Sequence, residues 1–321
     1  MYVLHGSGPS LFTRKLEAAL RFYGAPFEFR LKGDHPDPKL LELRAGTHQV
    51  PVLETPEGWM LADTTPIFDL LDSRFPARRL GPPGALGVLA HLVEECRDEW
   101  VARVMVHYRW HYPDSARFAS EIIANGDPVR AETVRGWGPR ACRATGTETD
   151  FHQKAAEAEY VRLLEAAEAQ LGETRYLLGD RPTAADCMML GGLWAHTLHD
   201  PDPRKVVQGF PRVVAWSATA ADWDGAGDWT AFPESTAFAR HVLREMADHY
   251  APVLRGHAEA LAAGRKAFTV DTYGEPASYL ARPYPVQSWA MIRARMERME
   301  PGEREVAAAW MDEVGLADGR P

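Results

Sequence analysis

The first 80 residues alternate between short apolar runs and segments in which apolar residues recur every three or four positions. Short runs such as Tyr2–His5 predict strands, and the recurrence over Leu11–Tyr23 predicts a helix that ends at Gly24. Thr64 is a suitable residue to cap a later helix. The predicted elements, in the order βαβαββα, are the strand 2–5, the helix 10–23, the strand 27–31, the helix 38–44, the strands 50–54 and 59–61, and the helix 64–75.

The pattern changes after residue 75. Residues 76–87 are rich in proline and glycine and predict a linker. Residues 88–222 carry helical periodicity with almost no strand signal. We therefore expect an α+β chain in three parts, which are a mixed domain over residues 1–80, an all-helical domain over residues 81–222 and a C-terminal extension over residues 223–321.

Two alternating runs in the extension, 267–273 and 279–282, flank a Gly-Glu-Pro turn and predict a hairpin over residues 267–283. A hairpin alone is marginally stable in water. The predicted hairpin and the helix predicted after it also carry more aromatic residues than a protein normally leaves exposed to solvent. We expect it to dock on the body of the protein, either as a structural brace or as a lid in which Arg282 or Tyr284 faces substrate. The aromatic residues are Phe268, Tyr273, Tyr279, Tyr284 and Trp289.

Composition excludes several classes of protein. The 321 residues include 36 Lys+Arg and 45 Asp+Glu, and the net charge of −9 argues against a general nucleic-acid binder, which needs a basic face. No apolar run reaches the length of a membrane span, and the N-terminus lacks the features of a signal peptide. The three cysteines, Cys96, Cys142 and Cys187, are spaced for neither a disulfide framework nor a zinc site. We therefore expect a cytoplasmic protein with no nucleic-acid or membrane partner.

Four short motifs stand out by their order and spacing. In the first, a serine-containing turn joins the first strand to a helix, and in the second, an X–Pro pair precedes the third strand. In the third, an acidic residue and a threonine open a helix. In the fourth, a segment similar to a capping box opens the most apolar helix. They are Ser7–Lys15, Val50–Pro51, Asp63–Thr64 and Gly179–Asp186.

Together these motifs resemble the glutathione S-transferase family, and the resemblance covers roughly residues 1–222. The stretch 140–190 is also similar, more faintly, to the branch that contains metaxins and failed-axon-connections proteins. The resemblance implies a thioredoxin-like N-terminal domain that binds glutathione as co-substrate, an all-helical second domain, and no metal.

The resemblance also implies which residues bind glutathione. In the family the bond before Pro51 is cis, a form that X–Pro tolerates at low cost, and the backbone of Val50 pairs with the cysteinyl part of glutathione. Asp63 and Thr64 open a helix, where free N–H groups and the helix dipole favour the γ-glutamyl carboxylate, although Thr64 can equally be only a helix cap. Polar or basic side chains just before the cis bond reach the glycyl carboxylate in the family, and here they are Gln49 and His48.

The catalytic group that the resemblance implies is Ser10, which makes this a serine-type member. Leu11 departs from the family pattern, which has proline there, and Ser7 is the competing candidate. A hydroxyl at a helix N-terminus can donate to a thiolate and so lower the pKa of a thiol from its ordinary value of about 8.5. Ser10 can alternatively be only a helix cap. Because no cysteine lies near this turn, mixed-disulfide chemistry is disfavoured.

Aromatic residues near the domain junction are the candidates for an apolar substrate pocket. They are Phe12 on the first helix and the run Tyr108, Trp110 and Tyr112, which core packing or a dimer face would explain equally well. Two histidine pairs, 107/111 and 196/199, have helical spacing, but no third ligand has convincing spacing, so we predict no metal site.

The sequence thus predicts a glutathione S-transferase-like enzyme. It would conjugate glutathione to a small apolar electrophile or catalyse a glutathione-dependent isomerisation, and by resemblance it would be a homodimer that serves detoxification. The alternative is a non-catalytic module of the same fold that binds glutathione or a protein partner, since a fold does not determine a function.

Overall fold

The computed structural model describes residues 1–232 and 234–316. Its N-terminal part confirms the predicted order βαβαββα. The elements of this part are β1 (Tyr2–Gly6), α1 (Leu11–Tyr23), β2 (Phe27–Leu31), α2 (Pro38–Ala45), β3 (Val52–Glu54), β4 (Met60–Leu61) and α3 (Thr64–Arg74).

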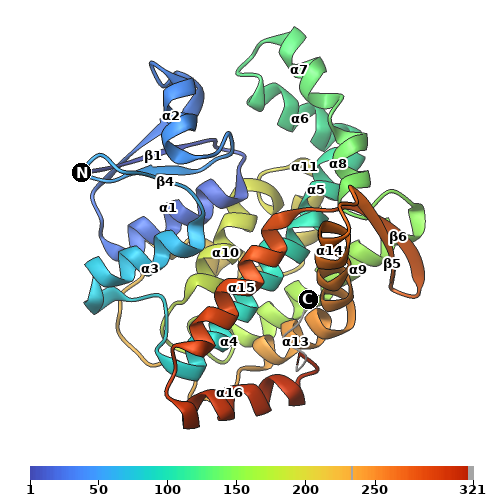
Figure 1. Cartoon of the computed structure of the whole chain (residues 1–321). Helices are drawn as coiled ribbons and strands as arrows, with labels where there is room; N and C mark the ends of the chain where they lie inside the picture. The colour runs from blue at the N-terminus through green and yellow to red at the C-terminus, as the bar shows by residue number, and fades with distance from the viewer. Residues whose placement is uncertain (233, 317–321) are drawn as a thin grey trace.

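The four strands of this part form one mixed sheet in the order β2-β1-β3-β4. β1 pairs parallel with β2, which puts His5 beside Arg30, and antiparallel with β3, while β3 and β4 are antiparallel. α1 and α3 lie on one side of the sheet and α2 on the other (Figure 1). β1 is buried along its whole length, and its carboxyl end leads into the turn Ser7–Ser10.

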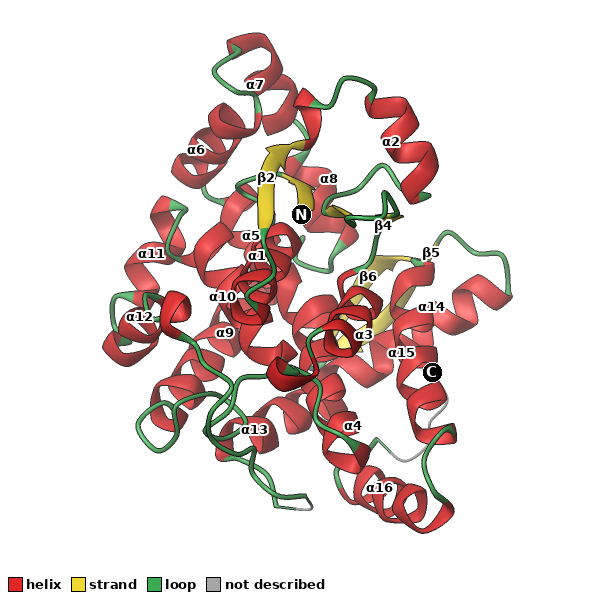
Figure 2. Ribbon diagram, turned by 90° about the vertical axis from the view of Figure 1, so that its left-hand side faces the viewer, coloured by secondary structure: helices red, strands yellow, loops and turns green. Residues whose placement is uncertain are grey.

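The second part of the chain is helical, as expected, and helices dominate the molecule (Figure 2). Its elements are α4 (Gly84–Glu95), the π-helix η3 (Cys96–Val101), α5 (Ala102–His111), α6 (Pro113–Ile123), α7 (Pro128–Arg135), α8 (Gly138–Ala144), α9 (Asp150–Gln170), α10 (Ala184–Gly192), the π-helix η4 (Leu193–Thr197), α11 (Pro201–Val207) and α12 (Pro211–Ser217). Within the described residues, no helix combines the length and the apolar character that crossing a membrane requires.

The helix α10 joins the two parts. It opens with the predicted capping box, in which the Thr183 N–H donates to the Asp186 carboxylate at 2.8 Å. It then packs along α1 so closely that a Cβ atom on Gly191 would stand 2.6 Å from the carbonyl oxygen of Leu11. A larger residue at 191 would push the two helices apart, so glycine is required for this packing.

The extension contains α13 (Ala237–Glu245), the π-helix η6 (Met246–Tyr250), α14 (Ala251–Ala262), β5 (Ala267–Thr272), β6 (Glu275–Leu280), α15 (Pro283–Glu297) and α16 (Pro301–Glu313). The predicted hairpin is present, but its second strand begins at Glu275, earlier than expected. The reason is a two-residue turn at Tyr273 and Gly274, which both have positive φ, as tight hairpin turns require. The helix α16 was not predicted from the sequence.

The hairpin docks on the helical part, as expected. Tyr279 is 4% exposed and pairs with Thr145 through an isolated β-bridge, while Phe268 packs on Gly256 of α14. Tyr273 donates a hydrogen bond to the buried carboxylate of Glu159 in α9. Phe268 and Tyr279 belong to the same hydrophobic cluster as residues of both domains, and Tyr273 packs against it, so the extension shares one core with the rest of the chain.

Candidate active site

The turn Ser7–Ser10 between β1 and α1 is held by both domains. From its own domain, Arg14 Nε donates to the carbonyl oxygen of Gly8 at 3.0 Å. From the helical domain, Arg109 Nη1 donates to the carbonyl oxygen of Pro9 at 2.7 Å. These two guanidinium groups, one from each domain, hold the adjacent carbonyl groups in the middle of the turn.

Ser10 is the N-cap of α1. Its Oγ accepts a hydrogen bond from the Thr13 N–H at 3.3 Å. Since a hydroxyl has one donor and two acceptor positions, this cap leaves the hydroxyl proton for a second partner, so the roles of cap and donor are compatible. Ser7 donates its backbone N–H to Thr13 Oγ1 at 3.3 Å, and Leu11 is 5% exposed and packs in the core.

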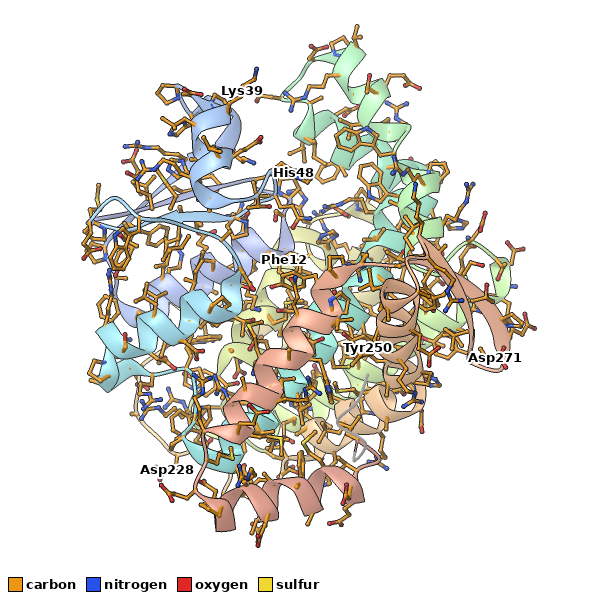
Figure 3. The ribbon with its side chains drawn as sticks, viewed as in Figure 1. Phe12, Lys39, His48, Asp228, Tyr250 and Asp271 are labelled. Atoms are coloured by element: carbon orange, nitrogen blue, oxygen red, sulfur yellow. The ribbon has the colours of Figure 1, made fainter. Side chains whose placement is uncertain are left out.

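The Val50–Pro51 peptide bond is cis, as the resemblance implied. Pro51 is buried at the start of β3, Val50 is half-buried, and the side chains of His48 and Gln49 are exposed. Figure 3 shows His48 and Phe12 on the side of the N-terminal domain that is turned toward the helical domain. The ammonium group of Lys32 donates to the carbonyl oxygens of both His48 and Gln49 and so anchors this loop.

Asp63 and Thr64 lie at the N-terminus of α3. Asp63 is the N-cap, with its carboxylate accepting from the Thr65 N–H at 3.2 Å, and its φ of 71° is in the region that favours glycine. Non-glycine residues rarely adopt this conformation and cluster at functional sites when they do. Burial raises the pKa of the Asp63 carboxyl, although hydrogen bonds from Tyr284 and from the Thr65 N–H oppose this shift.

A buried ion-pair network lies directly behind this helix terminus. Lys15 is fully buried, and its Nζ lies 2.5 Å from Asp98 Oδ2 and 2.7 Å from Glu94 Oε1. The hydroxyl of Thr65 donates to the same Glu94 oxygen at 3.1 Å. Burial lowers the pKa of Lys15, but the carboxylates of Asp98 and Glu94 raise it more, so its pKa is raised and Lys15 stays charged. The network ties α1 and α3 to α4 and η3.

The extension also reaches this region. Arg282 Nη2 lies 3.2 Å from Glu99 Oε2, and Ser288 donates a hydrogen bond to Glu95. Tyr250, near the centre of the molecule in Figure 3, donates to the other oxygen of Glu95 at 2.5 Å. The acidic residues of α4 and η3 therefore have partners in two parts of the chain. Glu94 and Asp98 pair with the N-terminal domain, and Glu95 and Glu99 contact the extension.

The aromatic candidates for the electrophile site differ in their burial and in what they pack against. Tyr108 is 4% exposed in the core and stacks on Tyr112 with 5.9 Å between the ring centroids. Tyr112 donates to Glu157 of α9 at 2.7 Å. Trp110 packs against Gly138 at the start of α8, and Phe12 is partly buried against the core. Of these four residues, Phe12 is the nearest to Ser10 along the chain, and Tyr108 has the smallest exposed fraction.

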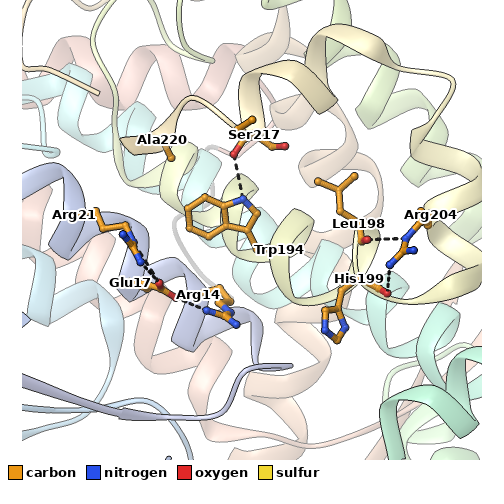
Figure 4. A pocket seen from close by; sticks show the side chains of 10 residues that line it. Arg14, Glu17, Arg21, Trp194, Leu198, His199, Arg204, Ser217 and Ala220 are labelled. Atoms are coloured by element: carbon orange, nitrogen blue, oxygen red, sulfur yellow. Dashed lines mark hydrogen bonds and ion pairs between the residues drawn. The ribbon is translucent and has the colours of Figure 1, made fainter. Parts of the chain in front are cut away.

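The histidine pairs form no metal site, and a hollow lies beside α1. No group of three or more metal-ligating side chains gathers among residues 1–232 and 234–316. A hollow of about 520 Å³ lies beside α1, with Trp194 at its centre and Arg14, Arg21 and Arg204 at its edge (Figure 4). Arg14 and Arg21 both pair with Glu17, and Arg204 donates to two backbone carbonyl oxygens. The residues that line this hollow, all in the described part of the chain, do not include Ser10 or Asp63.

Two family models match the sequence. Residues 4–81 match the family model of the glutathione S-transferase N-terminal domain, and residues 98–219 match that of the glutathione S-transferase C-terminal domain. The chain belongs to the glutathione S-transferase family. The two matches contain the Ser7–Ser10 turn, the cis bond, the start of α3 and the capping box of α10, and they leave the extension outside.

Several solved structures are similar to the chain at low sequence identity. A glutathione S-transferase from Rhodospirillum rubrum F11 is 17% identical, with 75% of this chain and 99% of that chain covered and a TM-score of 0.48. Beta-etherase LigF from Sphingobium sp. strain SYK-6 is 19% identical (68% and 93% covered, TM-score 0.47). A glutathione S-transferase from Methylobacterium radiotolerans JCM 2831, in complex with glutathione sulfonate, is 20% identical (73% and 98% covered, TM-score 0.43).

Sequence reasoning missed the acidic residues around the start of α3. Glu94 and Asp98, like Glu95 and Glu99, are four residues apart, so each pair lies on one face of the helix. These positions lie off the apolar stripe of the same helix, on the face where acidic residues are ordinarily solvated, so the local sequence gave no sign that they are buried. Lys15 appeared only as a member of a motif, and nothing in the local sequence indicated its partners.

Proposed function

We propose that this glutathione S-transferase joins the sulfur of glutathione to a small apolar electrophile, or uses glutathione to isomerise a substrate. The observation that carries the proposal is the N-terminus of α1, where Ser10 caps the helix through its oxygen and keeps its hydroxyl proton for another acceptor. That acceptor is the thiolate of glutathione.

The chemistry needs a thiolate at neutral pH. The Ser10 hydroxyl and the positive end of the α1 dipole both favour the anion over the thiol. Each unit by which the thiol pKa falls corresponds to about 1.4 kcal/mol of preferential thiolate binding. The thiolate sulfur then forms a bond to the electrophilic carbon while the leaving group departs with the bonding electrons, and the thiol proton has already passed to water.

The rest of glutathione is assigned to the same edge of the N-terminal domain. The γ-glutamyl ammonium pairs with Asp63, and the γ-glutamyl carboxylate meets the first N–H groups of α3 at Thr64. The cysteinyl backbone pairs with Val50 before the cis bond to Pro51. The glycyl carboxylate extends toward the exposed side chains on the loop before β3, which are Gln49 and His48.

The electrophile pocket is proposed to lie at the domain junction. Phe12, beside the serine turn, and Trp110, which keeps partial exposure, are the aromatic residues best placed to contact an apolar substrate. Tyr108 and Tyr112 would then shape the wall behind them through their packing on α9. Binding both reactants at one junction supplies proximity, which is a large part of the rate enhancement in a two-substrate reaction.

A glutathione-affinity column followed by a chloronitrobenzene conjugation assay tests the proposal. Retention on the column together with release of chloride and formation of the thioether supports the transferase. Retention without turnover of this or other electrophiles supports the alternative, a glutathione-binding module. Failure to bind glutathione at all contradicts both and leaves a protein-interaction module of the same fold.

A further inference from the structure

Arg109 is a buried arginine of α5 whose side chain reaches the serine turn from the helical domain. It is 4% exposed, and all three nitrogen atoms of its guanidinium group donate hydrogen bonds. Nη1 donates to the carbonyl oxygen of Pro9 at 2.7 Å, and Nε and Nη2 donate to Asp200 Oδ2 and Oδ1 at 2.8 and 3.0 Å. Nη2 also donates to the carbonyl oxygen of Ala195. One side chain therefore joins α5 to the turn, to η4 and to the residue that precedes α11.

The pairing with Asp200 fixes the plane of the guanidinium group. Two parallel N–H···O bonds to one carboxylate hold an arginine in a single orientation, which a lysine ammonium cannot reproduce. Asp200 is fully buried, and His199 Nδ1 lies 3.3 Å from its Oδ1. Burial opposes the charge of Asp200, but hydrogen bonds from His199 and Arg109 outweigh it and hold the pKa of this carboxyl below its ordinary value. The carboxylate stays ionised, and Nη1 of Arg109 stays directed at Pro9.

The guanidinium group has a further anchor in η4. Ala195 lies in the last turn of this π-helix, where the final carbonyl oxygens lack partners within the helix and the helix dipole favours a cation. Arg109 satisfies the Ala195 oxygen and brings a positive charge to this helix terminus. Asp200 and Ala195 both belong to the helical domain, so the position of the guanidinium group is set there. The bond to Pro9 connects that position to the N-terminal domain.

The carbonyl group of Pro9 belongs to the peptide unit that leads into Ser10. A peptide unit is planar, so a hydrogen bond to its oxygen fixes the plane from which the Cα of Ser10 projects. On the other side of the residue, the Thr13 N–H donates to Ser10 Oγ at 3.3 Å. The backbone of Ser10 is extended, with a φ of −96° and a ψ of 120°, as is usual for an N-cap residue. The hydroxyl is therefore held by one contact from its own helix and one from the other domain.

We propose that Arg109 is a positioning residue for the transferase reaction, which directs the Ser10 hydroxyl at the thiolate of glutathione. This rests on the proposed function, in which Arg109 contacts neither reactant. The next residue of α5, Trp110, is a proposed contact of the electrophile, so one helix sets both the wall of the pocket and the place of the catalytic hydroxyl. Arg14 of α1 holds the carbonyl group of Gly8, which is one peptide unit farther from Ser10. The helical domain thus controls the unit nearest to the hydroxyl.

The test compares two buried arginines of α5 in the full chain. Arg109→Lys keeps the positive charge but loses the paired bonds to Asp200 that direct Nη1 at the turn. Arg103→Lys is the matched control, since Arg103 is 3% exposed and its hydrogen bonds go to Glu159 and Tyr273. Steady-state kinetics with chloronitrobenzene separate kcat from the KM for glutathione, and the pH dependence of kcat gives the pKa of the bound thiol. Thermal unfolding measures the stability of each variant.

We expect Arg109→Lys to raise the pKa of the bound thiol by about one unit, and so to lower kcat about tenfold below that pKa, with the KM for glutathione nearly unchanged. Arg103→Lys should lose stability as Arg109→Lys does but keep the kcat and the thiol pKa of the wild type. In a Ser10→Ala background, the further change Arg109→Lys should have little effect on kcat, because Arg109 acts through Ser10. A residue that only stabilised the fold would lower kcat by the same factor in both backgrounds.

Folded Arg109→Lys with the kcat and thiol pKa of the wild type would overturn the inference. An equal loss of kcat in Arg103→Lys would overturn it too, because the effect would then come from a general loosening of α5. If Arg109→Lys does not fold, Asp200→Asn takes its place, since the amide keeps the shape of the carboxylate but cannot accept both bonds from the guanidinium group. The kcat and thiol pKa of the wild type in Asp200→Asn would overturn the inference in the same way.

Failure of the proposed function has a different signature. If the wild type does not conjugate glutathione, or if Ser10→Ala alone leaves kcat unchanged, the proposed function fails first and the inference fails with it. If the wild type conjugates glutathione and Ser10→Ala is impaired while Arg109→Lys is not, only the inference is wrong.

Discussion

The ammonium group of Lys15 lies 2.5 Å from the carboxylate of Asp98, and this ion pair joins the helix that begins at Ser10 to the first helices of the second domain. Both side chains are buried. The pair therefore fixes α1 relative to the junction where the two reactants are proposed to meet. A helix that presents a catalytic hydroxyl needs such support, because small displacements of reacting groups reduce the rate strongly.

Replacing Lys15 by methionine should destabilise the protein by about 3–5 kcal/mol, because it leaves the carboxylates of Asp98 and Glu94 buried without a partner. Urea denaturation measures the free energy of unfolding. Lys205→Met is the matched control, since Lys205 forms an exposed ion pair with Asp202 and its loss should change stability little. Equal effects of the two variants would contradict a structural role for the buried pair.

Ser10→Ala should lower kcat for conjugation about 100-fold, the usual cost of removing one donor to a reacting anion. Ser7→Ala should have a smaller effect, since Ser7 contacts Thr13 through its backbone N–H, which the substitution leaves in place. Because Ser10→Ala also removes a helix cap, stability should fall by about 1 kcal/mol. Ser10→Thr restores both cap and hydroxyl and should recover most of the activity. Full activity of Ser10→Ala across about pH 6–9, which brackets a lowered thiol pKa, would reject the assignment.

His91 should make the protein less stable in acid. Burial lowers its pKa to about 4, and both ring nitrogens are buried without a hydrogen-bond partner among the described residues. The unfolded chain, with a histidine pKa near 6.5, binds the proton first as the pH falls, so this residue costs about 2 kcal/mol of stability by about pH 5. His91→Leu should remove that cost. The measurement is the difference in unfolding free energy between variant and wild type at about pH 7.5 and at about pH 5. If this difference does not change with pH, the destabilising role of His91 in acid is contradicted.

Truncation before residue 265 should abolish folding or solubility. The removed segment carries Tyr273, Arg282 and Ser288, whose polar groups pair with buried acidic residues of the helical domain, and Trp289, which is 3% exposed in the shared core. Unpaired buried carboxylates and an exposed apolar surface would remain. Soluble expression and a cooperative thermal transition are the readouts. A truncated protein that melts like the full chain would show that the extension is dispensable.

A homodimer is expected from family membership, with the N-terminal domain of one subunit against the helical domain of the other. Both domains keep large apolar side chains exposed, such as Leu43 and Trp59 in the first and Val129 and Trp137 in the second. Light scattering at micromolar concentration measures the mass, and a monomeric mass would count against the prediction. C₂ dimers are also the commonest homo-oligomers, which favours this symmetry.

Much of the N-terminal domain could be predicted because its signals are local. The capping residue Ser10 and the left-handed conformation at Gly24 each depend on a few neighbouring residues, whereas the cis bond before Pro51 was expected from the family resemblance. The hairpin was predicted for the same reason, but its register was not. The positive φ of Tyr273 moved the turn, and a residue with a β-forming aromatic side chain gives no local indication of that conformation.

The pattern of apolar and polar residues was sufficient for the order of the elements in the N-terminal domain and for the structural class of each domain. Long-range packing set which groups meet: Lys15 with Asp98, Tyr273 with Glu159, and Arg282 with Glu99. These partners are separated by tens to hundreds of residues, and their pairing depends on how α10 and α15 cross α1, α3 and α4. Local propensity acts over one or two turns, whereas a buried charge finds its partner only when the whole core has assembled around it.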